Sequence, residues 1–206
     1  METTLNKTAA ALERRGYETI VCATGAEAAD AIRREMEKAQ SVGFGGSETI
    51  KALGIPELAK RMGKTILRHG DPSLSPEEKM AVMRGELTCD LFLLSANAMT
   101  ADGVIVNIDG NGNRVAASIF GPKRVVFAVG RNKIVDGGVE AAMERVKRCA
   151  CPPNCRRLSK RTPCAATGVC ADCSSPDRIF TVTTIFDRRP TKTSILVILI
   201  DEDLGY

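Results

Sequence analysis

Short apolar runs alternate with amphipathic stretches over the first third of the chain, and this alternation constrains the fold more than any other feature. Residues 24–38 have helical spacing behind a capping threonine, and the apolar run 41–44 follows them. Residues 48–53 resume a helical pattern after a Gly45-Gly46-Ser47 turn. Strands that alternate with helices favour a parallel arrangement. The sequence therefore predicts an α/β fold with a mixed, mostly parallel sheet and helices on both faces.

The middle of the chain has a different pattern, because four apolar runs follow one another between residues 91 and 129 with only turns between them. Residues 109–112, Asp-Gly-Asn-Gly, tolerate positive φ, as a tight hairpin requires. Two late strands, 178–186 and 192–201, are expected to return to the sheet edge or to pair with each other. Helices are expected at 2–15, 24–38, 48–53, 76–84 and 136–149, with another opened by Pro56, and strands at 17–23, 41–44, 65–68, 91–94, 104–108, 115–120 and 125–129.

The composition is that of an ordinary globular protein, since 44% of the 206 residues are hydrophobic and 26% are charged. One domain over residues 1–206 is expected, with a cysteine-rich loop insertion at about 149–177. The 29 basic and 25 acidic residues intermingle, which does not favour nucleic-acid binding. The longest apolar run, 195–200, is too short to span a membrane, and the first residues lack a signal-peptide pattern. A cytoplasmic location is therefore expected.

Small, amide and charged residues gather where the expected strands end, which is where α/β proteins bind ligands. The glycine turn at 45–47 lies between a strand and a helix, and the free N–H groups of such a turn favour an anion. Asp109, Asn111 and Asn113 have a simpler explanation as turn formers. The predicted ligand-binding residues are Gly45, Gly46, Ser47, Ser95, Asn97, Asp102, Asn107, Lys123 and Lys133.

The sequence offers few candidates for acid–base catalysis. Asp102 or Asp109, beside a lysine, could act as a general base. His69 is the single histidine and lies in an expected loop, so we expect it to be a surface side chain. The sequence assigns no catalytic residue.

Eight cysteines in a reducing compartment indicate metal or redox chemistry more than disulfides. The spacing C-x5-C-x2-C over residues 164–173 suits thiolate ligation of one ion or of cluster iron. Cys149 and Cys151 remain alternatives for the fourth ligand. The predicted cofactor is an iron–sulfur cluster or zinc, against the alternative of free or redox-active thiols. The predicted metal ligands are Cys164, Cys170, Cys173 and Cys155.

Several motifs together resemble those of the lactate-utilisation (LUD) domain family, over nearly the whole chain. They include Gly43-Phe44-Gly45-Gly46-Ser47, Leu94-Ser95-Ala96-Asn97-Ala98, Val106-Asn107-Ile108-Asp109-Gly110, Phe120-Gly121-Pro122-Lys123 and the cysteine loop through Asp172-Cys173. The resemblance implies a fold similar to that of ribose-5-phosphate isomerase, glucosamine-6-phosphate deaminase and CoA transferases. Relatives with this cysteine loop have a further cysteine after the Arg-Ile pair, where this chain has Phe180.

The resemblance also implies a role in lactate oxidation to pyruvate, in systems that include iron–sulfur subunits. We therefore expect a protein that binds a small anionic metabolite at strand ends and serves lactate or related 2-hydroxy acid metabolism. A second hypothesis is a cysteine-ligated iron–sulfur or zinc protein for electron transfer or redox sensing. A third is an isomerase or transferase of a phosphorylated or CoA-linked substrate. The expected partners are other lactate-oxidation subunits and a second copy of the chain, with no nucleic acid and no membrane.

Overall fold

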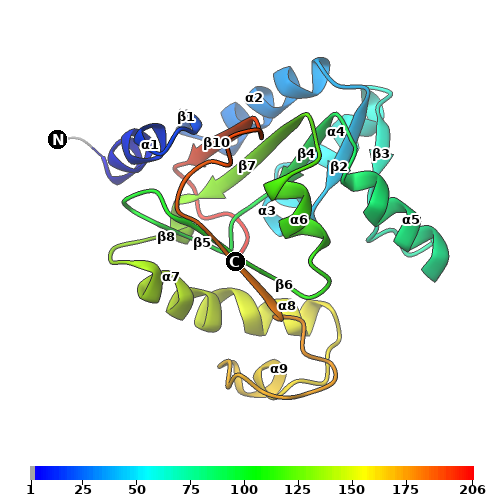
Figure 1. Cartoon of the computed structure of the whole chain (residues 1–206), viewed down its shortest axis with the longest axis vertical. Helices are drawn as coiled ribbons and strands as arrows, with labels where there is room; N and C mark the ends of the chain where they lie inside the picture. Colours follow the sequence, from blue (N-terminus) through cyan, green and yellow to red (C-terminus); the bar gives the residue numbers. More distant parts are fainter. Residues whose placement is uncertain (1–2) are drawn as a thin grey trace.

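A six-stranded sheet forms the centre of the computed structural model, which describes residues 3–206 (Figure 1). Every strand pair in this sheet is parallel, in agreement with the predicted alternation of strands and helices. Two of its strands consist of apolar residues that are buried along their whole length, as expected for strands covered on both faces. In sheet order the strands are β1 (Glu18–Cys22), β10 (Ile195–Ile200), β7 (Arg124–Gly130), β4 (Leu91–Leu94), β2 (Ser41–Phe44) and β3 (Thr65–Leu67).

Three helices cover one face of this sheet. The Thr24 side chain accepts a hydrogen bond from the N–H of Glu27, which caps the longest of the three. Ala28, Ile32 and Met36 recur at helical spacing on that helix and are fully buried against the sheet. The helices are α2 (Gly25–Glu37), α3 (Glu48–Ala52) and α4 (Ile55–Arg61).

A second, smaller sheet covers the other face. Met99, Ile105 and Phe186 of this sheet share one apolar core with Phe92 and Phe127 of the first. The rings of Phe127 and Phe186 meet edge to face, with centroids 6.1 Å apart. Antiparallel pairs occur in this sheet, so the fold is mixed as predicted. In sheet order its strands are β8 (Ile134–Val135), β5 (Ala98–Thr100), β6 (Ile105–Asp109) and β9 (Val182–Phe186).

Helices α1 (Thr4–Arg14), α5 (Pro76–Glu86) and α6 (Asn113–Ile119) flank the core between the sheets. Leu5 and Leu12 of α1 and Ala117 of α6 belong to this core. Ser75 and Glu78 form a capping box that starts α5.

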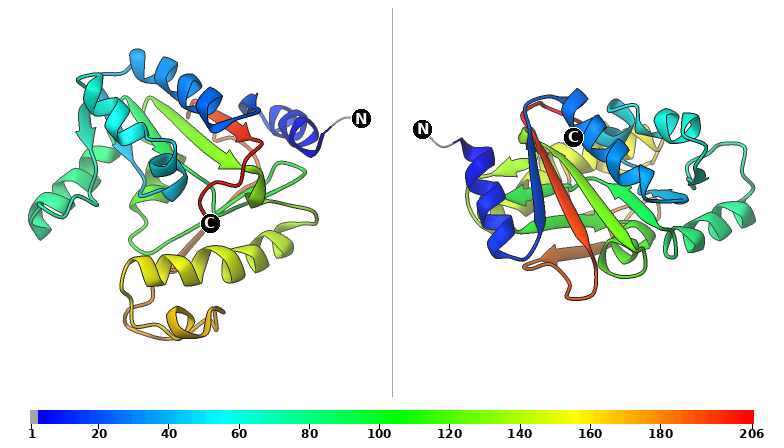
Figure 2. Two further views of the ribbon diagram at one scale, coloured as in Figure 1. Left: turned by 180° about the vertical axis from the view of Figure 1, so that it is seen from behind. Right: turned by 90° about the horizontal axis from the view of Figure 1, so that it is seen from above.

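A layer of helices packs on the outer face of the second sheet (Figures 1 and 2). Helix α7 (Val139–Arg145) continues through a π-helical turn (Val146–Ala150) into α8 (Cys151–Arg157), and α9 (Pro163–Thr167) packs on α8. The segment 149–177, expected to be a loop, therefore contains two helices. Prolines do not prevent them: Pro163 opens α9, where its missing N–H group is not needed, and Pro152 lies in the first turn of α8, directly after the π-helical turn.

Of residues 115–120, predicted to be a strand, 115–119 form part of α6 and Phe120 follows the helix. The expected hairpin at 109–112 instead leads β6 into this helix, with Gly112 at φ 82° immediately before it. The Asp109 carboxylate accepts a hydrogen bond from the N–H of Val115 at 2.9 Å, which holds the first turn. A run this short and uniformly apolar does not show whether its apolar residues recur with the period of a strand or of a helix. The prediction of a strand was therefore wrong.

Of the two late strands, β9 returns to a sheet edge as predicted, and β10 does not. Strand β10 is inside the six-stranded sheet, between β1 and β7, and β9 is at the edge of the second sheet beside β6. The six consecutive apolar residues of β10 require cover on both faces, which only an interior position provides. Strand β5 has three residues and is too short to leave a clear alternation in the sequence.

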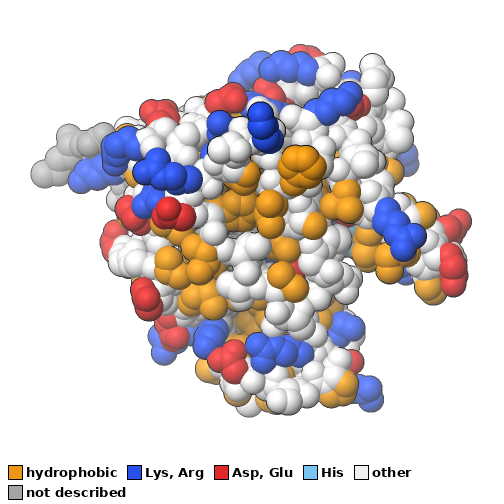
Figure 3. Space-filling view, in the orientation of Figure 1, with side chains coloured by type: hydrophobic (Ala, Val, Ile, Leu, Met, Phe, Trp, Pro, Cys, Tyr) orange, Lys and Arg blue, Asp and Glu red, His pale blue; other side chains and the backbone are white. Residues whose placement is uncertain are grey.

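Hydrophobic side chains gather across the middle of the face drawn in Figure 3, with charged side chains around them. Phe120, directly after α6, is 72% exposed, and its neighbour Ile119 is 40% exposed. Surface of this kind is often used for contacts with other proteins. Within residues 3–206, no helix has both the length and the hydropathy needed to cross a lipid bilayer.

Candidate functional site

A cavity of about 400 Å³ lies at the carboxyl ends of the parallel strands β2, β4 and β7. The segments that follow β2 and β4 form one wall, the segment between β6 and α6 forms another, and α8 with the C-terminal Tyr206 forms a third. The site thus takes residues from both sheets and from the outer helical layer. Among its lining residues are Gly45, Gly46, Ser47, His69, Ser95, Asn97, Asn113, Arg114, Lys133 and Arg157.

Lys133 is the buried cation of the cavity wall. It lies in a short 3₁₀-helix after β7 (Arg131–Lys133) and is 3% exposed. Its Nζ donates hydrogen bonds to Thr49 Oγ1 and Ser95 Oγ, each at 2.9 Å. Both acceptors are neutral hydroxyls, and within residues 3–206 no carboxylate forms an ion pair with this lysine. An ammonium group has three donors, so one remains for a ligand in the cavity.

The protonation of Lys133 is balanced near neutral pH. Burial, together with the nearby guanidinium groups of Arg145 and Arg114, lowers the pKa of Lys133 to about 7. Arg145 is itself held in place, since it donates to the main-chain carbonyls of Asn132 at 2.8 Å and Asn97 at 2.6 Å. An anion in the cavity would favour the ammonium form of Lys133, because it would supply the missing opposite charge.

Arg114 organises the polar wall and offers no free charge. Its guanidinium donates to Asp109 Oδ1 at 2.8 Å, to Asn107 Oδ1 at 2.8 Å and to Asn97 Oδ1 at 2.9 Å. Two main-chain carbonyls accept its remaining hydrogen bonds. Asp109, which the sequence suggested as a general base, is therefore committed to this ion pair.

His69 lies at the cavity wall beside a buried carboxylate. Its Nδ1 is 2.7 Å from Oε1 of Glu86, and its side chain is 22% exposed. Glu86 ends helix α5 and is fully buried, and its Oε2 accepts a hydrogen bond from Asn113 Nδ2 at 3.2 Å. The expectation that His69 is only a surface side chain is thus corrected by its contact with Glu86.

Basic side chains outnumber acidic ones around the cavity. Arg157 of α8 donates to the hydroxyl of Tyr206 at 2.7 Å and lies 3.7 Å from Glu48. This excess favours a negatively charged ligand. The charged lining groups are Arg114, Lys133, Arg157 and Lys160 against Glu48 and Asp109.

Six of the predicted ligand-binding residues line this cavity. A Cβ at Gly45 would come within 2.9 Å of Arg114 Cγ, so glycine there lets the arginine pass. The hydroxyl of Ser47 accepts a hydrogen bond from the N–H of Ile50 and caps α3. Because α3 has only five residues, its dipole is weak and Lys133 is the stronger anion-binding group. The six residues are Gly45, Gly46, Ser47, Ser95, Asn97 and Lys133.

The structure does not bring the other three to the cavity. Asn107 is fully buried behind the wall, where its side chain supports Arg114 and the N–H of Asn97. Asp102 lies in the turn after β5, with a side chain 64% exposed and an ion pair to Arg15. Lys123 precedes β7 at the opposite end of the sheet, and its side chain is 79% exposed. The cavity lies at the carboxyl ends of the parallel strands of the main sheet. Lys123 lies at the amino end of β7, and Asp102 follows a strand of the second sheet, so neither reaches it.

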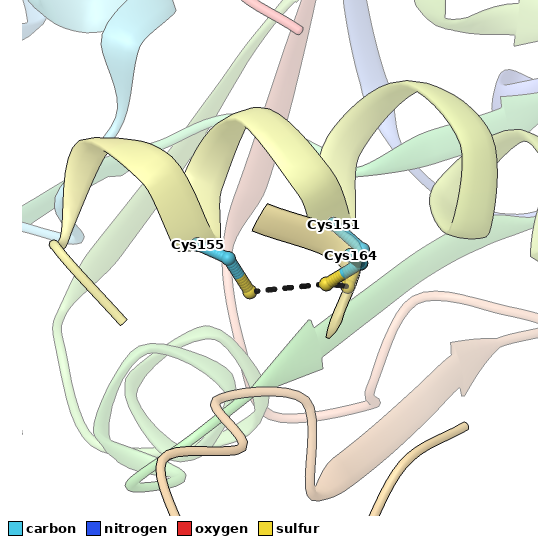
Figure 4. A group of neighbouring side chains, drawn as sticks. All are labelled: Cys151, Cys155 and Cys164. Carbon is cyan, nitrogen blue, oxygen red and sulfur yellow. Dashed lines mark hydrogen bonds between the residues drawn. The ribbon is translucent and has the colours of Figure 1, made fainter. Parts of the chain in front are cut away.

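Three cysteine thiols form a buried cluster in the outer helical layer (Figure 4). Cys151 and Cys155 lie one turn apart on α8, and Cys164 lies on α9. The Sγ atom of Cys164 is 3.6 Å from that of Cys155 and 3.9 Å from that of Cys151. A tetrahedral ion with metal–sulfur bonds of about 2.3 Å spaces its thiolates about 3.8 Å apart. The group could therefore hold one metal ion.

Cys170 and Cys173 line a small cavity beside this cluster, together with the buried Phe180. Of the predicted ligands, only Cys155 and Cys164 belong to the cluster itself. Cys151, which the sequence left as an alternative, is its third member. The one-turn spacing of residues 151 and 155 becomes a signal only once that segment is known to be helical.

The thiols of the cluster differ in acidity. Burial raises the pKa of Cys151, and the neighbouring Cys170 thiol adds to this shift. Burial also disfavours ionisation of Cys164, yet hydrogen bonds from Thr162, Cys155 and Cys151 outweigh it and lower the pKa of Cys164. Cys164 is therefore the thiol that ionises first and would begin metal binding.

Several residues at the two sites gave no sequence signal. Glu86 looks like an ordinary charged residue at the end of a helix, and Thr49 like an ordinary helical threonine. Arg157 and Tyr206 reach the cavity from parts of the chain that are distant from the glycine turn. Nothing in their local patterns indicates a pocket.

Comparison with known proteins agrees with this architecture. A family model, the LUD domain, matches residues 5–200. The crystal structure of a DUF162 family protein from Deinococcus radiodurans has a TM-score of 0.55 and 18% sequence identity, covering 96% of each chain. At that identity the likeness establishes the fold alone. No curated protein matches the chain.

Proposed function

The chain belongs to the LUD domain family, and from this premise we propose that its strand-end cavity binds a small anionic metabolite of lactate or related 2-hydroxy acid metabolism. Membership ties the chain to lactate-utilisation-type function at the level of the family. We also propose which residues bind the metabolite, and that the chain associates with other lactate-oxidation subunits or with a second copy of itself.

Lys133 is the observation that carries this proposal. A buried lysine without a carboxylate partner is costly, and its two hydroxyl partners do not neutralise it. A carboxylate or phosphate at its third donor would supply that charge. Arg157 and Lys160 at the same cavity add to the attraction for an anion. The cavity volume of about 400 Å³ is at the lower end of small-molecule sites.

Thermal denaturation with millimolar lactate, pyruvate, sugar phosphates, nucleotides and CoA esters tests the proposal. At least one anion should raise the Tm of the wild type and of Lys123→Met, and should not raise that of Lys133→Met. Lys123→Met is the matched control, because Lys123 lies outside the cavity in a surface ion pair. If none of these compounds changes the Tm of the wild type, the metabolite site does not exist.

A metal site is a second candidate function, favoured by the sulfur spacing in the cysteine cluster. Separations of 3.6 and 3.9 Å suit thiolates on one tetrahedral ion. Thiolates that bind different irons of a cluster lie farther apart, because each follows its own iron. We therefore favour zinc over an iron–sulfur cluster, with Cys151, Cys155 and Cys164 as ligands and Cys170 as the fourth.

Metal analysis of anaerobically purified protein tests this second candidate. We expect about one zinc per chain, as a closed thiolate site holds, and no visible absorption. Stoichiometric iron with cluster absorption would support the electron-transfer alternative instead. Sub-stoichiometric zinc and iron, with all eight thiols open to alkylation, would reject metal binding altogether.

A further inference from the structure

His69 lines the anion cavity together with Lys133, is backed by the buried Glu86, and has no part in the binding described above. We propose that this pair makes the cavity a proton-transfer site, in which His69 removes a proton from the carbon next to the carbonyl of a bound 2-oxo acid. This inference rests on the proposed binding of an anionic metabolite. It adds a reaction class and a catalytic residue to that site.

The contact with Glu86 selects one form of the imidazole. Oε1 of Glu86 lies 2.7 Å from Nδ1 of His69 and also accepts the main-chain N–H of His69 at 3.4 Å. The other oxygen, Oε2, accepts the Asn113 amide at 3.2 Å. A carboxylate that already accepts these bonds favours a proton on Nδ1, so Nε2 is left as the acceptor.

The free nitrogen faces the cavity. A Cβ placed on Gly46 would lie 3.9 Å from His69 Nε2, and both residues line the cavity. Gly46 has a positive φ of 64°, so it turns the chain at this point without placing a side chain before the histidine. The basic atom therefore lies beside Gly46 at the wall of the cavity that Lys133 also lines.

A purely structural role explains Glu86 poorly. This carboxylate is fully buried, and its side-chain partners are an imidazole and an amide instead of a cation of fixed charge. An apolar side chain at position 86 would avoid the cost of burying a carboxylate and would give a more stable folded protein. A buried carboxylate behind a histidine that faces a cavity is the arrangement that orients a general base and stabilises its protonated form.

The proposed step balances without any further reactant. His69 Nε2 takes the proton from the carbon, and the C–H electron pair becomes a C=C bond. The carbonyl π pair moves to its oxygen, and this oxygen shares the third donor of Lys133 with the adjacent carboxylate oxygen of the same 2-oxo acid. A proton from solvent then bonds to the carbon through the C=C pair while an oxygen pair re-forms the carbonyl, and the imidazolium of His69 releases its proton to solvent, which restores both the 2-oxo acid and the base. In D₂O the cycle replaces the hydrogens of that carbon with deuterium.

Proton NMR of pyruvate in D₂O tests the inference, with pyruvate binding measured separately by calorimetry. The wild type should exchange the methyl hydrogens faster than buffer alone. His69→Gln should lose about 100-fold or more of this rate while still binding pyruvate, as expected when a general base is removed. Glu86→Gln should fall between the two.

The outcomes distinguish this inference from the proposed function. If pyruvate binds and its methyl hydrogens do not exchange, the proton-transfer inference is wrong and the binding proposal stands. If pyruvate does not bind but another anion raises the Tm, the inference is again overturned and the binding proposal survives. If no anion binds, both fail.

The single histidine allows a second measurement that does not depend on turnover. In protein labelled with ¹⁵N-histidine, the wild type should show the proton on Nδ1, and Glu86→Gln should shift it toward Nε2. Melting curves establish that the wild type and Glu86→Gln are both folded. A folded Glu86→Gln variant with an unchanged tautomer would show that Glu86 does not position His69.

Discussion

Replacement of Lys133 by methionine tests whether the cavity lysine is kept at the expense of stability. Folding lowers the pKa of Lys133 from 10.5 to about 7, and each unit corresponds to about 1.4 kcal/mol. At pH 7 the buried lysine therefore costs about 4 kcal/mol of folding free energy. Methionine removes this cost and gives up two hydrogen bonds worth about 1 kcal/mol each. We expect Lys133→Met to gain about 2 kcal/mol in the free energy of unfolding.

The gain should depend on pH with a definite sign. Between pH 7 and about pH 10 the unfolded chain keeps the proton on Lys133 that the folded chain has released. Rising pH therefore stabilises the wild type through this group, and the cost of the lysine falls to about 1 kcal/mol near pH 10. The methionine variant has no amine and lacks this contribution. Relative to the wild type, the methionine variant should be more stable by about 2 kcal/mol at pH 7 and less stable by about 1 kcal/mol near pH 10, where the two lost hydrogen bonds outweigh the remaining cost of the lysine.

Urea unfolding of the wild type, Lys133→Met and the control Lys123→Met at both pH values measures these differences. The control should not gain stability, since the side chain of Lys123 is 79% exposed. A gain of about 2 kcal/mol corresponds to a Tm about 4–8 °C higher for a chain of this length. If Lys133→Met is less stable than the wild type at pH 7, or if the difference is the same near pH 10, Lys133 is a structural residue and the reasoning is refuted.

Three further substitutions test other parts of the structure. Arg114→Met leaves the buried Asp109 carboxylate without its cation, so the free energy of unfolding should fall by about 3–5 kcal/mol in urea titrations; a loss below 1 kcal/mol would show a minor role. Gly121→Ala should destabilise the chain by at least about 1–3 kcal/mol, because φ is 131° and a Cβ would lie 2.1 Å from the carbonyl oxygen of Leu87; an unchanged Tm would contradict this geometry. Cys164→Ser should lower the bound zinc measured by mass spectrometry, whereas Cys149→Ser, at an exposed thiol outside the cluster, should not. Equal zinc in both variants would place the ion elsewhere.

The strands of the main sheet could be predicted where a short apolar run had clear boundaries. The run 41–44 is bounded by a helix and by glycines, and it forms β2 as expected. The run 115–120 also ends at a glycine, Gly121, but the carboxylate of Asp109 together with Gly112 starts a helix there. The LUD motifs also led to a correct prediction. They extend over nearly the whole chain, and the LUD family model matches residues 5–200. The likeness to ribose-5-phosphate isomerase and the CoA transferases stays a prediction.

The candidate site could be predicted only in part, because the sequence shows which residues follow strands but not which side chains become buried together. The glycine turn, Ser95 and Lys133 follow parallel strands, so their shared edge was foreseeable. Lys123 flanks the same strand as Lys133 but at its amino end, and so it lies away from the cavity. The charge on Lys133 gave no indication that the side chain would be buried between two hydroxyls.

The sequence by itself determined the alternation of strands and helices, the glycine turn at the end of β2 and the supply of thiols after residue 149, because these features depend on neighbours along the chain. Only the tertiary structure decided which polar groups meet. Lys133 bonds Thr49 across 84 positions, and His69 finds Glu86 across 17 positions. Cys164 reaches Cys155 only when two helices fold back on each other. Burial and pairing of charge follow from the packing of the sheets and the outer helices, and no local pattern records that packing.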